Sequence, residues 1–191
     1  MAKSKEKGDK KFPIFANDNP LRRLFVPPRR LIGPYAGKGQ TAADLGCGPG
    51  FYTVPLAERV GPEGKVYAVD VDERAVRELE RKAAERGCRN IEAHASSASN
   101  LSFIKDASVD FALCHGLLCS MAPRQHEAAV SEIKRILKPG GLAYISVARG
   151  PWSYMGKKEW EEILAGFEVR RRSDGLPAIS DRWAVVSRKQ S

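Results

Sequence analysis

The sequence predicts an α/β protein with three layers, in which helices cover the two faces of one mostly parallel, seven-stranded sheet. From residue 41 onward, short β-rich apolar segments alternate with longer segments of helical periodicity, which is the pattern of parallel strands joined by crossover helices. A glycine-rich loop follows the first of these strands, where such proteins often bind a ligand. The last two strand-like segments lie close enough in sequence to pair as an antiparallel hairpin at one edge.

The first two strand and helix units are predicted from apolar runs that end at glycine residues. A strand at 41–45 precedes a helix at 51–60, which ends at Gly61. A second strand at 65–70 precedes a helix at 73–86, whose apolar side chains recur at helical spacing. Gly87 follows this helix directly and is a natural C-terminal cap. Both units have the length of ordinary crossover units.

The remaining elements continue the alternation to the end of the chain. A helix at 124–137 is expected to stop at Pro139, Gly140 and Gly141, which disfavour a continuing helix. The other predicted elements are strands at 90–95, 109–115, 142–148, 167–172 and 182–188 and a short helix at 157–165.

The positive charge of the chain is concentrated at its ends. The formal net charge is +9, of which residues 1–30 carry +6, whereas residues 31–148 are neutral. We therefore divide the chain into a basic tail with an N-terminal lid segment at 1–40 and a ligand-binding domain at 41–191. The basic tail either solvates the protein or meets an anionic partner such as a nucleic acid backbone. Pro27 and Pro28 are expected to begin a short helix in the lid segment.

Several classes of protein are disfavoured by composition. The longest apolar runs are strand-sized, far below the roughly 20 residues that a membrane-spanning helix needs, and the basic N-terminus lacks the apolar stretch of a secretory signal. The four cysteines form no CxxC pair, which favours reduced thiols over disulfides or a zinc site. A cytoplasmic location without a bound metal is the expectation, and the oligomeric state is left open.

The strongest functional signal is the loop Asp44-Leu45-Gly46-Cys47-Gly48-Pro49-Gly50, between a predicted strand and a predicted helix. Glycines there allow a tight turn and a close approach of the backbone to a ligand, and the following helix presents free N–H groups. The loop is not the dinucleotide fingerprint GxGxxG, because Phe51 stands where its third glycine would be. It is not a phosphate-binding Walker loop either, since no Gly-Lys-Ser/Thr follows.

Asp70 ends the second predicted strand, twenty residues after the last glycine of this loop. Neighbouring parallel strands end at the same edge of a sheet, so this carboxylate can accept hydrogen bonds from the two hydroxyls of a ribose lying over the loop. The pair of signals predicts a ligand that carries adenosine.

Four segments together resemble the class I, Rossmann-like S-adenosylmethionine-dependent methyltransferases: DLGCGPG, VYAVDVD, VDFALCHGLL and LKPGGLAYISV. The resemblance is close over residues 41–148 and loose over 149–188. It implies a seven-stranded sheet with a reversed last hairpin and a cofactor, S-adenosylmethionine, over the carboxyl ends of the strands. It also implies a set of cofactor-binding residues: the methionine and ribose portion would lie along Gly46, Cys47, Gly48 and Gly50, the amino group near Asp44, the ribose hydroxyls at Asp70 and the adenine on Val71.

The chain departs from the family pattern at two positions. Where many members carry an aspartate that binds the adenine amino group, this chain has Ser97, so recognition is expected from Ser97 or from backbone groups of Ser97 and Ala98. His115 ends the fourth predicted strand, where cofactor and acceptor would meet, and is the candidate catalytic residue, either as a contact to the cofactor or acceptor or as a general base.

No motif for a particular methyl acceptor is present. The fourth strand lacks the Asn/Asp-Pro-Pro-aromatic motif of base amino-group methylation, and no Pro-Cys nucleophile of cytosine methylation is found. Aromatic residues outside the shared core favour a small-molecule acceptor, methylated by direct displacement with no metal. Three alternatives stay open: a methyltransferase that uses the basic N-terminus to act on RNA or another macromolecule, a non-catalytic cofactor-binding module, and a nucleotide-dependent oxidoreductase.

Overall fold

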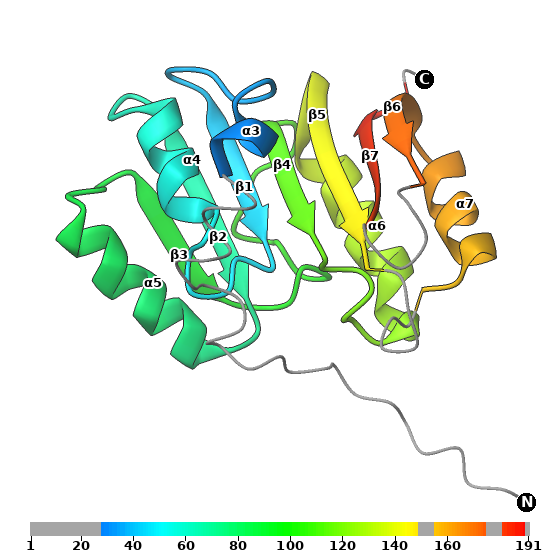
Figure 1. The fold of residues 1–191 in the computed structure, drawn as a ribbon, viewed down its shortest axis with the longest axis horizontal. Helices are drawn as coiled ribbons and strands as arrows, with labels where there is room; N and C mark the ends of the chain where they lie inside the picture. Colours follow the sequence, from blue (N-terminus) through cyan, green and yellow to red (C-terminus); the bar gives the residue numbers. More distant parts are fainter. Residues whose placement is uncertain (1–27, 149–154, 175–180, 190–191) are drawn as a thin grey trace, which may run out of the picture.

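Seven strands form one sheet in the order β3-β2-β1-β4-β5-β7-β6, with helices on its two faces (Figure 1). This computed structural model describes residues 28–148, 155–174 and 181–189. The strands are β1 (Thr41–Leu45), β2 (Lys65–Asp70), β3 (Ile91–Ala95), β4 (Val109–His115), β5 (Leu137–Val147), β6 (Glu168–Ser173) and β7 (Arg182–Ser187). The helices are α3 (Pro28–Ile32), α4 (Thr53–Val60), α5 (Glu73–Glu85), the 3₁₀ turn η1 (Pro123–Gln125), α6 (His126–Ile136) and α7 (Lys157–Ala165).

Strand direction changes only at β7 among the strands described. The strands β1 to β5 pair in parallel, whereas β7 lies between β5 and β6 and is antiparallel to each of them. Trp183 is therefore opposite Ser146, so β7 begins at the edge of the sheet where β5 ends. The predicted α/β class and the reversed last hairpin are confirmed.

The two faces of the sheet carry separate hydrophobic cores. Helices α3 and α4 pack on one face, where Ile32 and Leu56 lie buried with Phe111 of β4. Helices α6 and α7 cover the opposite face, where Ile133 and Trp160 belong to the other core. Because side chains alternate along a strand, each central strand supplies buried residues to both cores, as the apolar runs predict.

The boundary between α6 and β5 differs from the prediction. The sequence predicts a strand from residue 142, but β5 begins at Leu137, which pairs with Val109 before a register shift toward Phe111. Gly140 adopts a positive φ of 78°, and a Cβ on Gly141 would lie 2.9 Å from the Val109 carbonyl oxygen. The glycines that end the helix thus let an irregular strand continue. Other boundaries differ by one or two residues.

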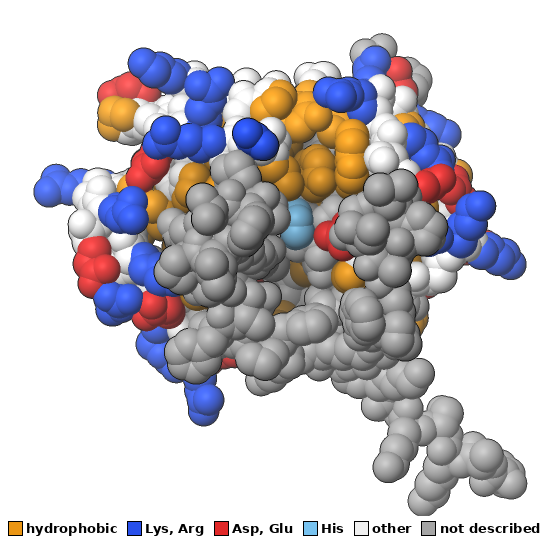
Figure 2. Space-filling model, in the orientation of Figure 1, with side chains coloured by type: hydrophobic (Ala, Val, Ile, Leu, Met, Phe, Trp, Pro, Cys, Tyr) orange, Lys and Arg blue, Asp and Glu red, His pale blue; other side chains and the backbone are white. Residues whose placement is uncertain are grey.

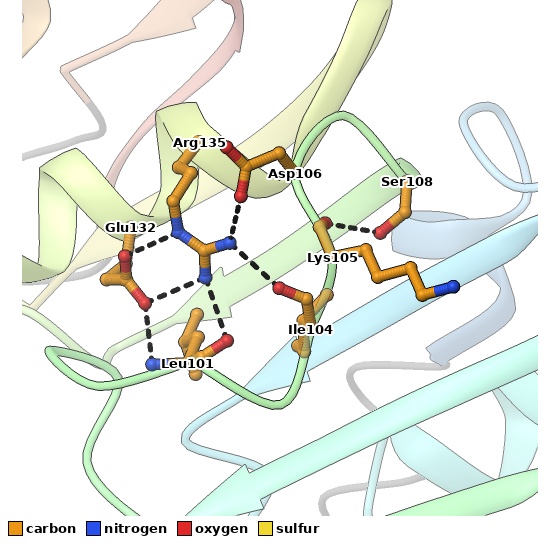
Figure 3. A network of polar contacts seen from close by, with 7 residues as sticks. All are labelled: Leu101, Ile104, Lys105, Asp106, Ser108, Glu132 and Arg135. Atoms are coloured by element: carbon orange, nitrogen blue, oxygen red, sulfur yellow. Dashed lines mark hydrogen bonds and ion pairs between the residues drawn. The ribbon is translucent and has the colours of Figure 1, made fainter.

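The connection from β3 to β4 contains no helix within its described residues, 96–108. Polar side chains of α6 stabilise it instead (Figure 3). The Arg135 guanidinium donates to the carbonyl oxygens of Leu101 and Ile104, each at 2.8 Å. The Glu132 carboxylate accepts from the Leu101 N–H at 2.6 Å and pairs with Arg135. These side chains satisfy backbone groups that a helix would otherwise have paired internally.

Replacing Arg135 with Met is expected to lower the free energy of unfolding by about 2–4 kcal/mol. The change leaves two carbonyl oxygens without their donor and the Glu132 carboxylate without its cationic partner in a partly buried site. Urea unfolding at pH 7 measures the loss. The matched control is Arg81→Met, which removes exposed ion pairs with Glu78 and Glu85 on α5 and is expected to change stability little. Equal losses in the two variants would contradict this role of Arg135.

Candidate cofactor site

A cavity of about 300 Å³ opens at the edge of the sheet where β1, β2 and β4 end. Nine of the ten residues predicted from the sequence line it; Gly50 is not among its described lining residues. The nine are Asp44, Gly46, Cys47, Gly48, Asp70, Val71, Ser97, Ala98 and His115. The structure thus brings together residues from four separate segments of the chain.

The glycine loop places its backbone against this cavity. Gly48 has a φ of 51° and nothing within 4 Å of where a Cβ would stand, so its backbone faces open space. Gly50 has a different task, because a Cβ there would lie 2.5 Å from the Leu79 side chain of α5. Gly50 therefore lets the loop pack on the neighbouring helix, which explains its absence from the lining described.

Asp70 connects the glycine loop to the turn after β2. Its Oδ2 accepts from the Gly48 N–H at 2.8 Å and its Oδ1 accepts from the Asp72 N–H at 2.9 Å. Each carboxylate oxygen has a second acceptor site, so this orientation allows further hydrogen bonds from ligand hydroxyls. The next residue, Val71, is 48% exposed and lines the cavity. It offers an apolar surface for a flat group.

Asp44 is a buried acid that lines the cavity and is only 2% exposed. Burial raises the pKa of its carboxyl from 3.8 to about 7; the hydrogen bond from Thr53 Oγ1, at 2.6 Å, opposes this rise and the charge of Asp70 adds to it. A buried carboxyl with a raised pKa gains most from a cationic ligand group, which restores the interactions that its charged form has lost to burial. The position suits an amino group.

The Ser97 hydroxyl is engaged in its own turn. Its Oγ lies 2.7 Å from the Ser99 Oγ and accepts from the Ser99 N–H at 3.2 Å. Ala98 is buried beside it, at 4% exposure. The hydroxyl stabilises the loop of Ser97 and Ala98 that lines the cavity. The family resemblance does not predict this local role.

His115 stands at the end of β4 in a row of aromatic rings. Its ring centroid lies 4.9 Å from that of Tyr52 and 6.4 Å from that of Tyr144, and Tyr144 in turn stacks on Trp183 at 5.8 Å. Tyr52 precedes α4, and it lines the cavity together with Asp181, which precedes β7. Sequence reasoning missed both. For Tyr52 a signal existed, because it lies two residues after Gly50, the last residue of the glycine loop.

The cysteines near the cavity are thiols rather than reactive thiolates. Cys47 and Cys119 line it, and all four cysteines of the chain are free. Burial raises the pKa of Cys47, as do the charges of Asp44 and Asp70, and burial likewise raises the pKa of Cys114. Within the part of the chain described, no cluster of three His, Cys, Asp or Glu residues is placed to hold a metal ion. No described helix combines the length and apolar character needed to cross a membrane.

Comparison with known proteins matches this site to one family. A family model described as a methyltransferase domain matches residues 42–141, which include the glycine loop, Asp70 and His115. The demethylmenaquinone methyltransferase of Geobacillus stearothermophilus is 37% identical over 105 residues, which are 55% of this chain and 44% of that protein. The chain thus matches less than half the length of that relative.

Two further similarities extend over more of the chain. The demethylmenaquinone methyltransferase of Anoxybacillus flavithermus is 34% identical over 165 residues, covering 76% of this chain and 68% of that protein. A crystal structure of an S-adenosylmethionine-dependent methyltransferase from Aquifex aeolicus superposes with a TM-score of 0.78 at 26% identity, covering 92% of this chain and 98% of the other. The similarity therefore includes the strands after β5 as well as the glycine loop.

Proposed function

Because this chain belongs to the class I S-adenosylmethionine-dependent methyltransferases, we propose that it transfers a methyl group to a small-molecule acceptor by direct displacement. The observation that carries the proposal is that one cavity is lined by the glycine loop, Asp44, Asp70 and His115. The relatives named for demethylmenaquinone support a small-molecule acceptor.

The lining residues fit the cofactor in chemistry. We assign its amino group to Asp44, its ribose hydroxyls to Asp70 and its adenine to the apolar side chain of Val71. The backbone of Gly46, Cys47 and Gly48 would lie along the methionine and ribose portion, and backbone groups of Ser97 and Ala98 would face the adenine edge. These assignments are supported by a buried carboxyl, a carboxylate with acceptor sites to spare and an exposed valine in the lining of one cavity.

His115 is the proposed catalytic residue, and it contacts the acceptor. When bound, the cofactor supplies a methyl group on a positively charged sulfur. The side chains of Tyr52 and Tyr144 hold the imidazole in place by ring contacts. An imidazole held in this way fixes the acceptor atom in line with the methyl group. Positioning of this kind can supply a large part of the rate acceleration of methyl transfer.

Calorimetric titration of the purified full chain tests the cofactor assignment. We expect micromolar binding of S-adenosylmethionine and S-adenosylhomocysteine and no binding of NAD, because the loop lacks the third glycine of dinucleotide-binding proteins. Binding of NAD alone would overturn the proposal and favour an oxidoreductase. Cofactor binding without turnover on a broad acceptor panel would favour the non-catalytic module.

A nucleic acid substrate is the second candidate, supported by the +6 charge of residues 1–30, most of which lie outside the described residues. It requires RNA binding by the full chain that weakens by orders of magnitude between about 50 and 200 mM salt. Binding that is absent or insensitive to salt would exclude this candidate.

The four free thiols are consistent with a reducing compartment, and we propose the cytoplasm.

A further inference from the structure

We propose that Asp181 binds the methyl acceptor and selects an uncharged or cationic molecule that presents an O–H or N–H group, against anions such as phosphorylated compounds. The inference rests on the proposed function, because it concerns the acceptor side of the same cavity. Nothing in the glycine loop or in the other family motifs includes this residue.

The reversed direction of β7 brings Asp181 to the cavity. In the register of β5 and β7, Arg182 is opposite Val147, the last residue of β5. Asp181 directly precedes Arg182, so it lies at the same edge of the sheet as the ends of β1, β2 and β4. It lines the cavity together with Ala148 and His115. Had β7 run parallel to β5, this residue would lie at the opposite edge of the sheet.

Asp181 is separate from the acids assigned to the cofactor. Asp44 and Asp70 lie on β1 and β2, while Asp181 enters from β7, on the far side of β4 and β5 in the sheet order. The cavity is lined by four aspartates, and its described lining residues include no Lys or Arg; Asp72 is the fourth acid. An anion approaching His115 therefore meets repulsion from Asp181.

The surroundings of Asp181 suit an apolar molecule. Burial raises the pKa of the Tyr144 hydroxyl, and the neighbouring Tyr52 and the charge of Asp181 raise it further, so the field of Asp181 reaches the aromatic row. That row continues from His115 through Tyr144 to Trp183. In the view of Figure 2, a histidine and an acidic side chain are visible at the surface, below a hydrophobic area. A carboxylate beside aromatic rings binds an apolar body that carries a hydrogen-bond donor.

The chemistry of transfer is consistent with this selection. The acceptor oxygen or nitrogen forms a bond to the methyl carbon while the carbon–sulfur bond breaks, and its electron pair returns to sulfur, which leaves as a neutral thioether. The acceptor atom becomes positively charged and then loses its proton to the Asp181 carboxylate. An acceptor atom that has already lost its proton would need no such proton acceptor, so the carboxylate has a use only for acceptors that present an O–H or N–H group.

Separate titrations with two related probes test the inference. The full chain, saturated with S-adenosylhomocysteine, is titrated by calorimetry with 2-naphthol and with naphthalene-2-sulfonate. The two probes share one flat ring system, but 2-naphthol presents an O–H donor and the sulfonate carries a negative charge and no donor. We expect 2-naphthol to bind about tenfold or more tightly than the sulfonate, as one hydrogen bond to a charged group implies. In Asp181→Asn the ratio is expected to fall toward one. Asp174→Asn, an exposed acid in an ion pair with Arg172, is the control and should keep the ratio.

The outcomes distinguish failure of the inference about Asp181 from failure of the proposed function. Equal or tighter binding of the sulfonate by the native protein overturns the inference, and so does an unchanged ratio in Asp181→Asn. Either result with intact binding of S-adenosylhomocysteine leaves the proposed function standing. If the native protein does not bind S-adenosylhomocysteine, the proposed function itself is overturned, and the inference with it.

Discussion

Asp44→Asn is expected to make the cofactor-free protein more stable above pH 7 and to weaken the binding of S-adenosylhomocysteine. The carboxyl has a pKa of about 7 in the folded chain, against an ordinary value of 3.8. The folded protein therefore holds this proton where the unfolded chain has lost it, so stability falls as pH rises from about 4 to about 7. The accumulated loss is about 4 kcal/mol.

Asparagine does not ionise, so the variant escapes this loss while it keeps an oxygen that can accept from Thr53. Urea unfolding at pH 4.5 and pH 8 measures the effect: the stability gain of the variant should be about 3 kcal/mol larger at pH 8. Glu80→Gln, an exposed acid on α5, is the control and should show no such difference. A gain that does not depend on pH would contradict the raised pKa of Asp44.

The same variant tests the amino-group assignment. Loss of a charged partner is expected to weaken S-adenosylhomocysteine binding about tenfold or more. In the native protein this affinity should rise with pH up to about pH 7, as Asp44 ionises. The ligand control is 5′-methylthioadenosine, which lacks the amino acid portion and should bind the variant as tightly as the native protein. Equal weakening for the two ligands would place Asp44 away from the amino group.

Asp70→Ala is expected to weaken cofactor binding by about 1–3 kcal/mol, which is roughly 5- to 150-fold in the dissociation constant. The carboxylate that holds Gly48 is lost together with its spare acceptor sites for the ribose hydroxyls. Isothermal titration with S-adenosylhomocysteine measures the loss.

A double-mutant cycle distinguishes ribose contact from loosening of the glycine loop. Adenosine and 2′,3′-dideoxyadenosine are each titrated into the native protein and into Asp70→Ala. If Asp70 binds the hydroxyls, removing them costs affinity in the native protein and little in the variant. The same penalty in the two proteins would refute this placement of the ribose.

Much of the fold could be predicted because its signals are local. Strands such as Thr41–Leu45 and Lys65–Asp70 are short apolar runs between turn residues, and they occur where predicted. The start of β5 at Leu137 could not be predicted in this way. It depends on a partner strand, Val109, that lies 28 positions earlier in the chain. Pairing of strands overrides the local preference of a Pro-Gly-Gly segment to end an element.

The residues of the candidate site also differ in whether their place could be predicted from the sequence. Asp44, Asp70 and His115 could be placed at one edge of the sheet from sequence alone, because parallel strands end together. Asp181 could not, since its place depends on the reversal of β7.

The sequence by itself determined the order of strands and helices, the glycine loop and the identity of the family, because these follow from periodicity and from residue types at short spacing. The tertiary structure decided the raised pKa of Asp44, the engagement of the Ser97 hydroxyl and the support of the β3–β4 connection by Arg135. Burial, hydrogen bonding and charge act through space, between groups whose separation along the chain says little about their distance in the fold.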